Sequence, residues 1–500
     1  MVATRSGRVE GRFVRGRAVF RGVPYAAPPV GERRFRAPVP PEPWTGVRDA
    51  RGHAPAAPQN EAMIRILSAL AGTGPAGVGD DCLTVNVWTP AADDAKRPVL
   101  VWIHGGAFLM GSGGALVYDG GSLAARGDLV VVTVNYRLGA FGFLSFGESA
   151  PAGFADSNPG LRDQVAALEW VRDNIAAFGG DPERVTIFGE SAGAMSVGTL
   201  LATPAARGLF RGAIAQSGAM HNVSTPEASA RVAETFLAEF GLAMGDAHAL
   251  RDVPTRDLLR AQRKVTQKLG FTHRGLPFQP AEDGDWLPEQ PLAALEAGRA
   301  AQVPLLLGTN RDEWDLFQAG DRKARELDAA ALRRRFERAF EASADAAAAD
   351  ELYAAVYGDR PPHRRWSAFQ TDRVFRAPAE RMAELHSEHA PTWAYGFTWV
   401  PPHLRRFVGA GHAMEVPLVF GTWRHPMVRG LTLGAGPLSR KIQDRWIAFA
   451  RDGDPGHPKW KPYTREGRHL HRLGPRGDCP MARFEQVRAF WAAHDHGTRG

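Results

Sequence analysis

The sequence is poor in cysteine and has no long apolar run. Its 500 residues include two cysteines, Cys82 and Cys479, and neither lies in a pattern typical of a metal ligand or a nucleophile. No apolar run approaches membrane-spanning length, and the N-terminus has no apolar segment followed by a small-residue cleavage site. We therefore expect a cytoplasmic location, two free thiols and no membrane partner.

Lysine is also scarce, because nearly all the basic residues are arginine, and the formal net charge of +7 is a small excess for this length. Basic clusters such as Arg333–Arg335 stand in an alanine-rich, helix-like segment, which favours a solvated helix face over a phosphate groove. We find no phosphate loop, dinucleotide fingerprint or metal-spaced cluster of His and Cys in the structural context that each motif needs. The sequence thus predicts no nucleic-acid partner, no cofactor and no metal site.

Internal repeats and low-complexity linkers are missing as well, and 44% of the residues are hydrophobic, which suits one large core. We predict a single α/β domain over residues 1–500 and expect a monomer. Residues 224–300 and 320–390, rich in Ala, Arg and Leu, are predicted to be helical insertions that roof a pocket.

The remaining pattern is that of a mostly parallel sheet flanked by helices. After about 50 residues of short antiparallel strands and turns, three apolar runs of strand length follow, and the last two lack strict alternation, as in strands covered on both faces. A helix then has apolar residues at a spacing of three and four. Further strands are predicted near the middle and the C-terminal third. The runs are 83–90, 98–106 and 128–139, the helix begins near 158, and the later strands lie within 212–218, 303–310 and 391–400.

One serine stands where a strand turns into a helix. Val185–Phe188 reads as a buried strand and Ala192–Leu201 as a packed helix, so that Gly189-Glu190-Ser191-Ala192-Gly193 must turn the corner. Two glycines allow a sharp bend, which would hold Ser191 on an exposed tip at the carboxyl end of a central strand. Taken alone, this pentapeptide fits a nucleophile and a tight structural turn about equally well.

A serine nucleophile needs a histidine base and an acid that orients it, in the order Ser, Asp or Glu, His for this type of fold. The segment after the strand at 303–310 offers Asp312, Glu313 and Asp315, each of which could also be a solvent-facing or N-capping carboxylate. His412 follows in a glycine-rich loop. The required order is present.

Acyl transfer also needs donors for an oxyanion. The segment His104 to Phe108, "HGGAF", directly follows a predicted strand, so that the N–H groups of Gly105 and Gly106 can join that of Ala192. His104 itself is expected to brace this loop rather than to transfer protons.

Nearly end to end, the chain resembles the type-B carboxylesterase and lipase family, the group that includes bacterial para-nitrobenzyl esterases and the cholinesterases. The segments that carry the likeness are "FRGVPYAAPPVGERRFRAP", "DDCLTVNVWTP", "VWIHGGAF", "VTVNYRLGAFGFL", "GGDPERVTIFGESAGAMS", "AIAQSGA", "GTNRDEW", "HAMEVPLVFG" and "WIAFARDGDP". The resemblance implies an α/β-hydrolase fold. Its implied site has Ser191 as nucleophile, Glu313 as acid, His412 as base, Gly105, Gly106 and Ala192 as oxyanion donors, and Glu190 and Ser217 as a supporting network.

Three departures from the family pattern bear on specificity. Relatives often carry a disulfide from the cysteine of an "EDCL" motif to an earlier cysteine, whereas Cys82 has none before it, so the loop at 55–79 is expected to be unbridged and mobile. That loop has no tryptophan, which disfavours choline esters as substrates. Trp314 stands where many relatives have glycine and is expected to reshape the wall near Glu313.

These features predict a serine carboxylesterase that hydrolyses short- to medium-chain or aryl esters, hence small molecules, through an acyl-enzyme. An amidase or carbamate hydrolase with the same triad is the first alternative. The second is a binding protein on the same fold, which the presence of Ser191, Glu313 and His412 argues against.

Overall fold

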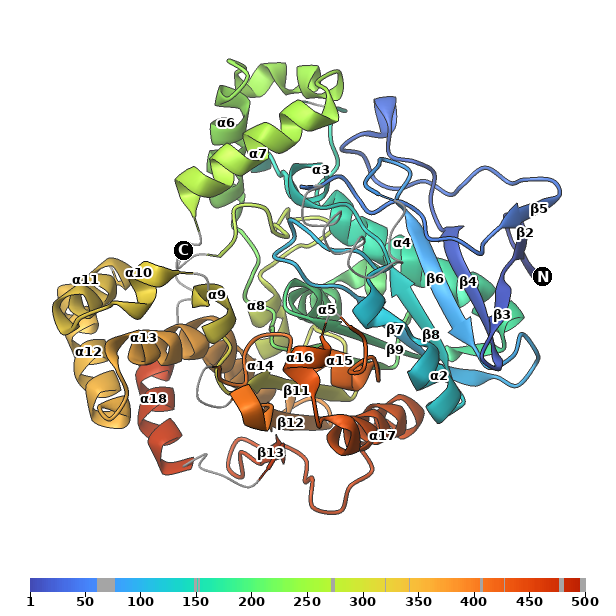
Figure 1. Ribbon diagram of the computed structural model, residues 1–500. Helices are drawn as coiled ribbons and strands as arrows, with labels where there is room; N and C mark the ends of the chain where they lie inside the picture. Colours follow the sequence, from blue (N-terminus) through green and yellow to red (C-terminus); the bar gives the residue numbers. More distant parts are fainter. Residues whose placement is uncertain are drawn as a thin grey trace.

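The structure is a computed structural model, shown in Figure 1. It describes residues 1–60, 77–147, 151, 153–270, 275–319, 321–340, 342–404, 408–426, 428–475 and 481–494.

A ten-stranded sheet forms the centre of the described part of the chain, in the order β13-β12-β11-β10-β9-β7-β8-β6-β4-β3. The seven strands from β13 to β8 run parallel, and the three at the other edge pair antiparallel. The strands are β3 (Arg12–Val14), β4 (Arg17–Pro24), β6 (Thr84–Thr89), β7 (Arg97–Ile103), β8 (Val130–Val134), β9 (Gly180–Glu190), β10 (Gly212–Gln216), β11 (Leu305–Asn310), β12 (Thr392–Phe397) and β13 (Leu470–Leu473). The predicted mostly parallel sheet is confirmed.

The N-terminal segment adds a three-stranded sheet of β1 (Val2–Thr4), β2 (Gly7–Glu10) and β5 (Val47–Asp49). The sequence predicts antiparallel strands here, and β1 and β2 do pair in that way. However, β2 and β5 pair in parallel, because the chain between them is long enough to return in the same direction.

Both faces of the large sheet are covered by helices, which is why its central strands lack polar alternation (Figure 1). One core contains Val99 and Val101 of β7, and the other contains Leu100 and Trp102 from the opposite face of the same strand. The first core is closed by α4 (Pro159–Asn174), α5 (Ala192–Ala202) and α14 (Ala377–His386), and the second by α2 (Gly121–Gly127), α15 (Val416–Val419) and α17 (Gly436–Asp452).

The two segments predicted to be insertions are mainly helical where they are described. The first contains α6 (Pro226–Ala238), the 3₁₀ turns of η6 (Met244–Arg251), α7 (Thr255–Leu269) and α8 (Pro291–Glu296). The second contains α10 (Arg322–Arg325), α11 (Ala329–Ala339), α12 (Ser343–Tyr357), α13 (Pro362–Thr371), a π-helical turn η7 (Asp372–Arg376) and α14. Shorter helices α3 (Gly139–Phe143), α9 (Asp315–Gln318) and α16 (Arg429–Thr432) lie elsewhere.

Helices α11, α12 and α13 have a hydrophobic cluster of their own, which the C-terminal helix α18 (Met481–Ala493) completes. Phe336, Tyr353 and Phe369 pack there against Trp491, and all four are buried. The second helical segment therefore has a core separate from the two that flank the sheet. Figure 1 shows these helices together at one side of the sheet.

The structure describes one of the two cysteines, Cys82. Cys82 is a free thiol, buried so that its pKa is raised above the usual value, whereas Cys479 lies outside the described residues. Among the helices of the described part of the chain, none is long and apolar enough to cross a membrane.

The loop predicted at 55–79 falls mostly outside the described residues, at 61–76. Its two ends lie side by side, since Ala56 N–H donates to the carbonyl of Gly77 at 2.9 Å and Gly79 N–H donates to the carbonyl of Ala56 at 3.0 Å. The amide of Gln59 also pairs with both backbone groups of Gly111, at 2.8 and 2.9 Å. The start of the loop is thereby joined to the segment that follows β7.

Candidate active site

Ser191 lies at the turn between β9 and α5 in a strained backbone conformation, with φ +56° and ψ −127°. A left-handed φ is costly for a residue with a side chain, and such strain gathers at functional sites. The turn closes tightly, since a Cβ on Gly193 would lie 2.0 Å from the carbonyl oxygen of Ile103. Ser191 N–H donates to the carbonyl of Gln216 on β10 at 2.9 Å, which fixes the turn against the sheet. The sequence-predicted elbow is therefore present as a backbone feature.

Gly105 and Gly106, which follow β7, lie beside this turn. A Cβ on Gly105 would be 3.0 Å from the Cβ of Ser191, so a side chain at that position would crowd the serine. Within the described residues, the N–H groups of Gly105, Gly106 and Ala192 have no hydrogen-bond acceptor. Unpaired backbone donors next to a half-buried serine can bind a negatively charged oxygen.

His104 is buried behind this loop. Its ring stacks on Tyr136 with centroids 4.5 Å apart, and its Nδ1 lies 2.9 Å from the carbonyl oxygen of Gly105. Burial lowers the pKa of His104 to about 4, so that the ring is neutral. This placement fits the expectation that His104 braces the loop.

Glu313 and His412 are in direct contact. His412 Nδ1 donates to Glu313 Oε2 at 2.7 Å, and Glu313 Oε1 accepts the backbone N–H of Asn310 at 2.6 Å. Glu313 is fully buried and His412 is 7% exposed. Asp312 and Asp315, the other two acids of this segment, make no contact with the imidazole and bind backbone and arginine groups instead.

The other side of the imidazole faces Glu190. His412 Nε2 lies 3.0 Å from Glu190 Oε1, although the two atoms are not aligned for a hydrogen bond. Ser191 Oγ has no hydrogen-bond partner among the described residues. The structure therefore brings Glu190, Glu313 and His412 together, and the serine hydroxyl makes no hydrogen bond to any of them.

The carboxylates around His412 control its charge. Burial lowers the pKa of the imidazole, but the charge of Glu190, the hydrogen bond to Glu313 and the more distant Glu415 outweigh burial and raise it to about 9. Burial in turn raises the pKa of Glu190 to about 8, against the opposing effect of His412. The imidazole and Glu190 therefore titrate as a coupled pair above neutral pH.

Glu415 is a buried carboxylate that the sequence analysis missed. It stands three residues after His412 and accepts hydrogen bonds from Gln216 Nε2 at 3.0 Å and Asn310 Nδ2 at 2.6 Å. Trp446 Nε1–H holds Gln216 from behind, at 3.0 Å. The position of Glu415 in "HAMEV" was a local signal for this contact. A residue three positions after His412 lies about one turn further on and so returns towards it.

Ser217, the other predicted member of the supporting network, is fully buried with a left-handed φ of +53°. Its N–H donates to the carbonyl of Gly308 at 2.8 Å, while its hydroxyl has no partner in the described part of the chain. Ser217 therefore sits at the carboxyl end of β10, next to the strand that leads to Glu313.

Two phenylalanines flank the imidazole, with ring centroids 5.1 Å from His412 for Phe317 and 4.8 Å for Phe375. Phe375 comes from the π-helical turn η7, an irregularity that often occurs at functional sites. Phe317 is 45% exposed and also contacts the ring of Trp314, the residue that replaces glycine in the family pattern, with centroids 4.8 Å apart. The second helical segment thus reaches His412 through an aromatic contact.

In the part of the chain that the structure describes, no group of three or more His, Cys, Asp or Glu side chains has the arrangement of a metal site.

The parallel sheet, the strand–serine–helix elbow and the Glu–His pair at the carboxyl ends of the strands define the chain as an α/β-hydrolase. The model of the carboxylesterase family matches residues 1–491. The chain therefore belongs to the carboxylesterase family, and it is a carboxylic ester hydrolase of type B.

Curated relatives match over nearly the whole length. Para-nitrobenzyl esterase of Bacillus subtilis is 41% identical over 94% of this chain and 93% of its own. Phenmedipham hydrolase of Pseudarthrobacter oxydans is 37% identical over 95% of both chains. Among solved structures, a PNB esterase superposes with a TM-score of 0.84 at 39% identity, covering 97% of this chain and 98% of that one. A carboxylesterase of Geobacillus stearothermophilus gives the same TM-score at 38% identity, covering 98% and 99%.

Proposed function

We propose that the protein cleaves short- to medium-chain or aryl carboxylic esters with Ser191 as nucleophile, His412 as general base and Glu313 as the acid that orients it. The contact that carries this proposal is the hydrogen bond from His412 Nδ1 to Glu313 Oε2 at 2.7 Å, next to the strained serine. The names of the relatives, para-nitrobenzyl esterase among them, support an ester with an aromatic alcohol part.

In the proposed reaction, His412 Nε2 removes the proton of Ser191 Oγ as the oxygen attacks the ester carbonyl carbon. The carbonyl oxygen becomes an oxyanion and accepts hydrogen bonds from the N–H groups of Gly105, Gly106 and Ala192. When the C–O bond to the alcohol breaks, His412 returns the proton to the departing oxygen. Water then enters, loses a proton to His412 and attacks the acyl carbon, and as the bond to Ser191 Oγ breaks His412 returns that proton to the serine oxygen and the acid is released.

For this reaction His412 Nε2, which lies 3.0 Å from Glu190 Oε1 in the structure, must be within hydrogen-bond reach of Ser191 Oγ when the ester binds. The Nδ1 contact with Glu313 holds the other side of the ring. Glu190 and Ser217 are proposed to support the site, Glu190 through the charge it presents to the imidazole.

Hydrolysis of a graded series of para-nitrophenyl esters, from acetate to palmitate, tests the proposal with the wild type and Ser191→Ala in parallel. We expect serine-dependent turnover that peaks at short to medium acyl chains, because the sequence shows no evident interfacial segment that would dock the protein on aggregated long-chain esters. Absence of serine-dependent turnover for every ester would refute the proposal, and para-nitroanilides would then test the amidase alternative.

The pH dependence of kcat/KM gives a second test. The base must be neutral to accept a proton, so kcat/KM should fall as the pH drops through the pKa of His412. Since the neighbouring carboxylates raise this pKa to about 9, we expect the acid limb above pH 6.5, and Glu190→Gln should move it towards lower pH. A profile that is flat from about pH 5 to 8 would contradict the assignment of His412.

A further inference from the structure

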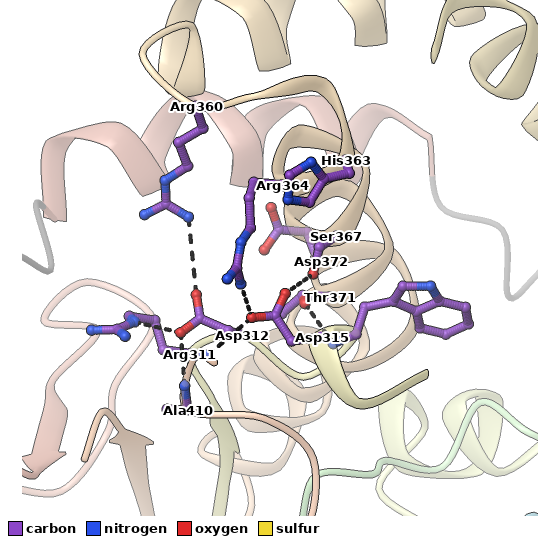
Figure 2. Close-up of polar contacts among 12 residues, drawn as sticks. Arg311, Asp312, Asp315, Arg360, His363, Arg364, Ser367, Thr371, Asp372 and Ala410 are labelled. Atoms are coloured by element: carbon purple, nitrogen blue, oxygen red, sulfur yellow. Dashed lines mark hydrogen bonds and ion pairs between the residues drawn. The ribbon is translucent and has the colours of Figure 1, made fainter. Parts of the chain in front are cut away.

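Asp312 and Asp315 stand on either side of Glu313 in the sequence, and Figure 2 shows their carboxylates facing Ala410 and the second helical segment. Both carboxylates are largely buried, with side chains 12% and 9% exposed. Buried carboxylates are rare unless they are paired, so their partners indicate what they are for.

The first set of partners is the backbone that leads to His412. Asp312 Oδ2 accepts the N–H of Ala410 at 2.9 Å, and Asp315 Oδ2 accepts the N–H of Gly409 at 3.1 Å. The backbone of the two segments also pairs directly, with Asp312 N–H on the carbonyl of Ala410 at 2.9 Å and His412 N–H on the carbonyl of Glu313 at 3.3 Å. Three N–H groups within 409–412 are therefore bound by the segment that carries Glu313.

The approach of these two segments is close. A Cβ on Gly409 would lie 2.4 Å from Asp312 Oδ2, so only glycine leaves room for the carboxylate at this position. The loop before His412 is thus shaped around Asp312.

The second set of partners comes from the second helical segment. Arg364 and Ser367 of α13 both bind the carboxylate of Asp315, the hydroxyl at 2.7 Å, and Arg360 Nη1 lies 3.9 Å from Asp312 Oδ1. Between Glu313 and Asp315, Trp314 N–H donates to Thr371 Oγ1 at the end of α13, at 3.1 Å. Each aspartate therefore binds the backbone before His412 and also faces the second helical segment. Asp312 faces Arg360, just before α13, and Asp315 binds two side chains of α13 itself.

Arginines neutralise the two carboxylates of this network. Arg311 Nε lies 2.8 Å from Asp312 Oδ2, and together with Arg360 and Arg364 it surrounds the two carboxylates with cations. The groups that raise the pKa of His412 are Glu190, Glu313 and Glu415, and the two aspartates are not among them. Their effect on the imidazole is therefore geometric.

We propose that Asp312 and Asp315 are positioning residues, which fix the backbone at 409–412 and so aim the imidazole of His412 at Glu313, with α13 as the support behind them. This inference rests on the proposed function of His412 and adds to it the reason why the second helical segment matters to the reaction. It also assigns a role to the two acids that compete with Glu313 in the sequence.

The test compares Asp315→Ala with Asp315→Asn. The alanine variant loses the acceptor for Gly409 N–H, whereas the asparagine carbonyl keeps it and its amide faces the hydroxyl of Ser367, which can accept. We expect kcat to fall roughly 10- to 100-fold for Asp315→Ala with little change in KM, because small misplacements of a catalytic group have effects of this size. Asp315→Asn should restore most of the rate.

Asp156→Ala is the matched control. Asp156 also binds one backbone N–H, that of Ala37 at 2.6 Å, and one arginine, Arg36 at 3.1 Å, but it does not contact the histidine loop. It should keep the wild-type kcat. An equal loss in Asp156→Ala would mean that Asp315→Ala acts through general destabilisation, which would overturn the proposal, as would a wild-type kcat in Asp315→Ala.

A measurement without turnover separates this proposal from the proposed function. In ¹⁵N-histidine-labelled protein, the Nδ1 proton of His412 bound to Glu313 should give a low-field resonance, assigned by its loss in His412→Gln. We expect it to weaken or shift in Asp315→Ala and to persist in Asp315→Asn. An unchanged resonance in Asp315→Ala would overturn the positioning role even if the wild type hydrolysed no ester. Asp312→Ala, which should show the same signature, serves if Asp315→Ala does not fold.

Discussion

Replacement of His412 by glutamine is expected to lower kcat for ester hydrolysis by roughly 10⁵- to 10⁶-fold, the loss typical of a serine hydrolase without its histidine. A serine hydroxyl is a poor nucleophile at neutral pH, and the alcohol departs slowly without a proton donor, so the variant loses both proton transfers. The unpaired N–H groups near Gly105 and Ala192 remain and should leave a small residual rate above that of water. Initial rates with para-nitrophenyl acetate measure the loss.

His386→Gln is the control for this prediction. His386 is also fully buried, but its ring bonds to Thr392 Oγ1 at 2.9 Å, away from the site. We expect this variant to lose stability in thermal unfolding and to keep its kcat. A His412→Gln protein that retained more than about 1% of the wild-type kcat would disprove the role of His412.

Replacement of Glu313 by glutamine is expected to cost about 10⁴-fold in kcat, as for the isosteric change of the acid in other triads. The carboxylate accepts the Nδ1 proton at 2.7 Å and stabilises the charged imidazole as it forms. An amide in the same place loses the negative charge and can turn its NH₂ group towards Nδ1, which favours the wrong tautomer. The same change should lower the pKa of His412, because the hydrogen bond to Glu313 is one of the causes that raise it.

The neighbouring aspartates make this prediction specific. Asp312→Asn and Asp315→Asn should each lose less than about tenfold, since both keep an acceptor for the histidine loop and neither original carboxylate contacts the imidazole. Should either of them match the loss in Glu313→Gln, the assignment of the acid would be wrong. Kinetics of the three variants on one substrate decide between them.

Local sequence predicted most of the central sheet, because its strands are continuous apolar runs. Val130–Val134 and Leu305–Asn310 are buried throughout and need no partner to be recognised. The edge strand Leu470–Leu473 was missed, since it has only four residues and two of them are polar. It is a strand because Phe397 and its neighbours on β12 pair with it.

The site was predictable to the extent that motifs mark it. Ser191, Glu313 and His412 stand in short patterns with a known order, and the structure places the last two in contact. The roles of the two aspartates depend on Gly409 and Ala410, almost a hundred residues away, and no local pattern reports such a contact. The approach of Glu190 to the imidazole was predicted only from the resemblance to the family. Local sequence does not report it, because it depends on the rotamers of both side chains.

The two ends of the loop at 55–79 are bonded to each other and to the segment after β7, so the peptide between them can be replaced as a unit. The backbone bonds between Ala56 and Gly77 and the double contact of Gln59 with Gly111 hold its ends, independently of the length between them. Each doubling of a loop's length costs only ~0.6 kcal/mol of closure entropy, so segments of different length from relatives can be inserted at this base at little cost.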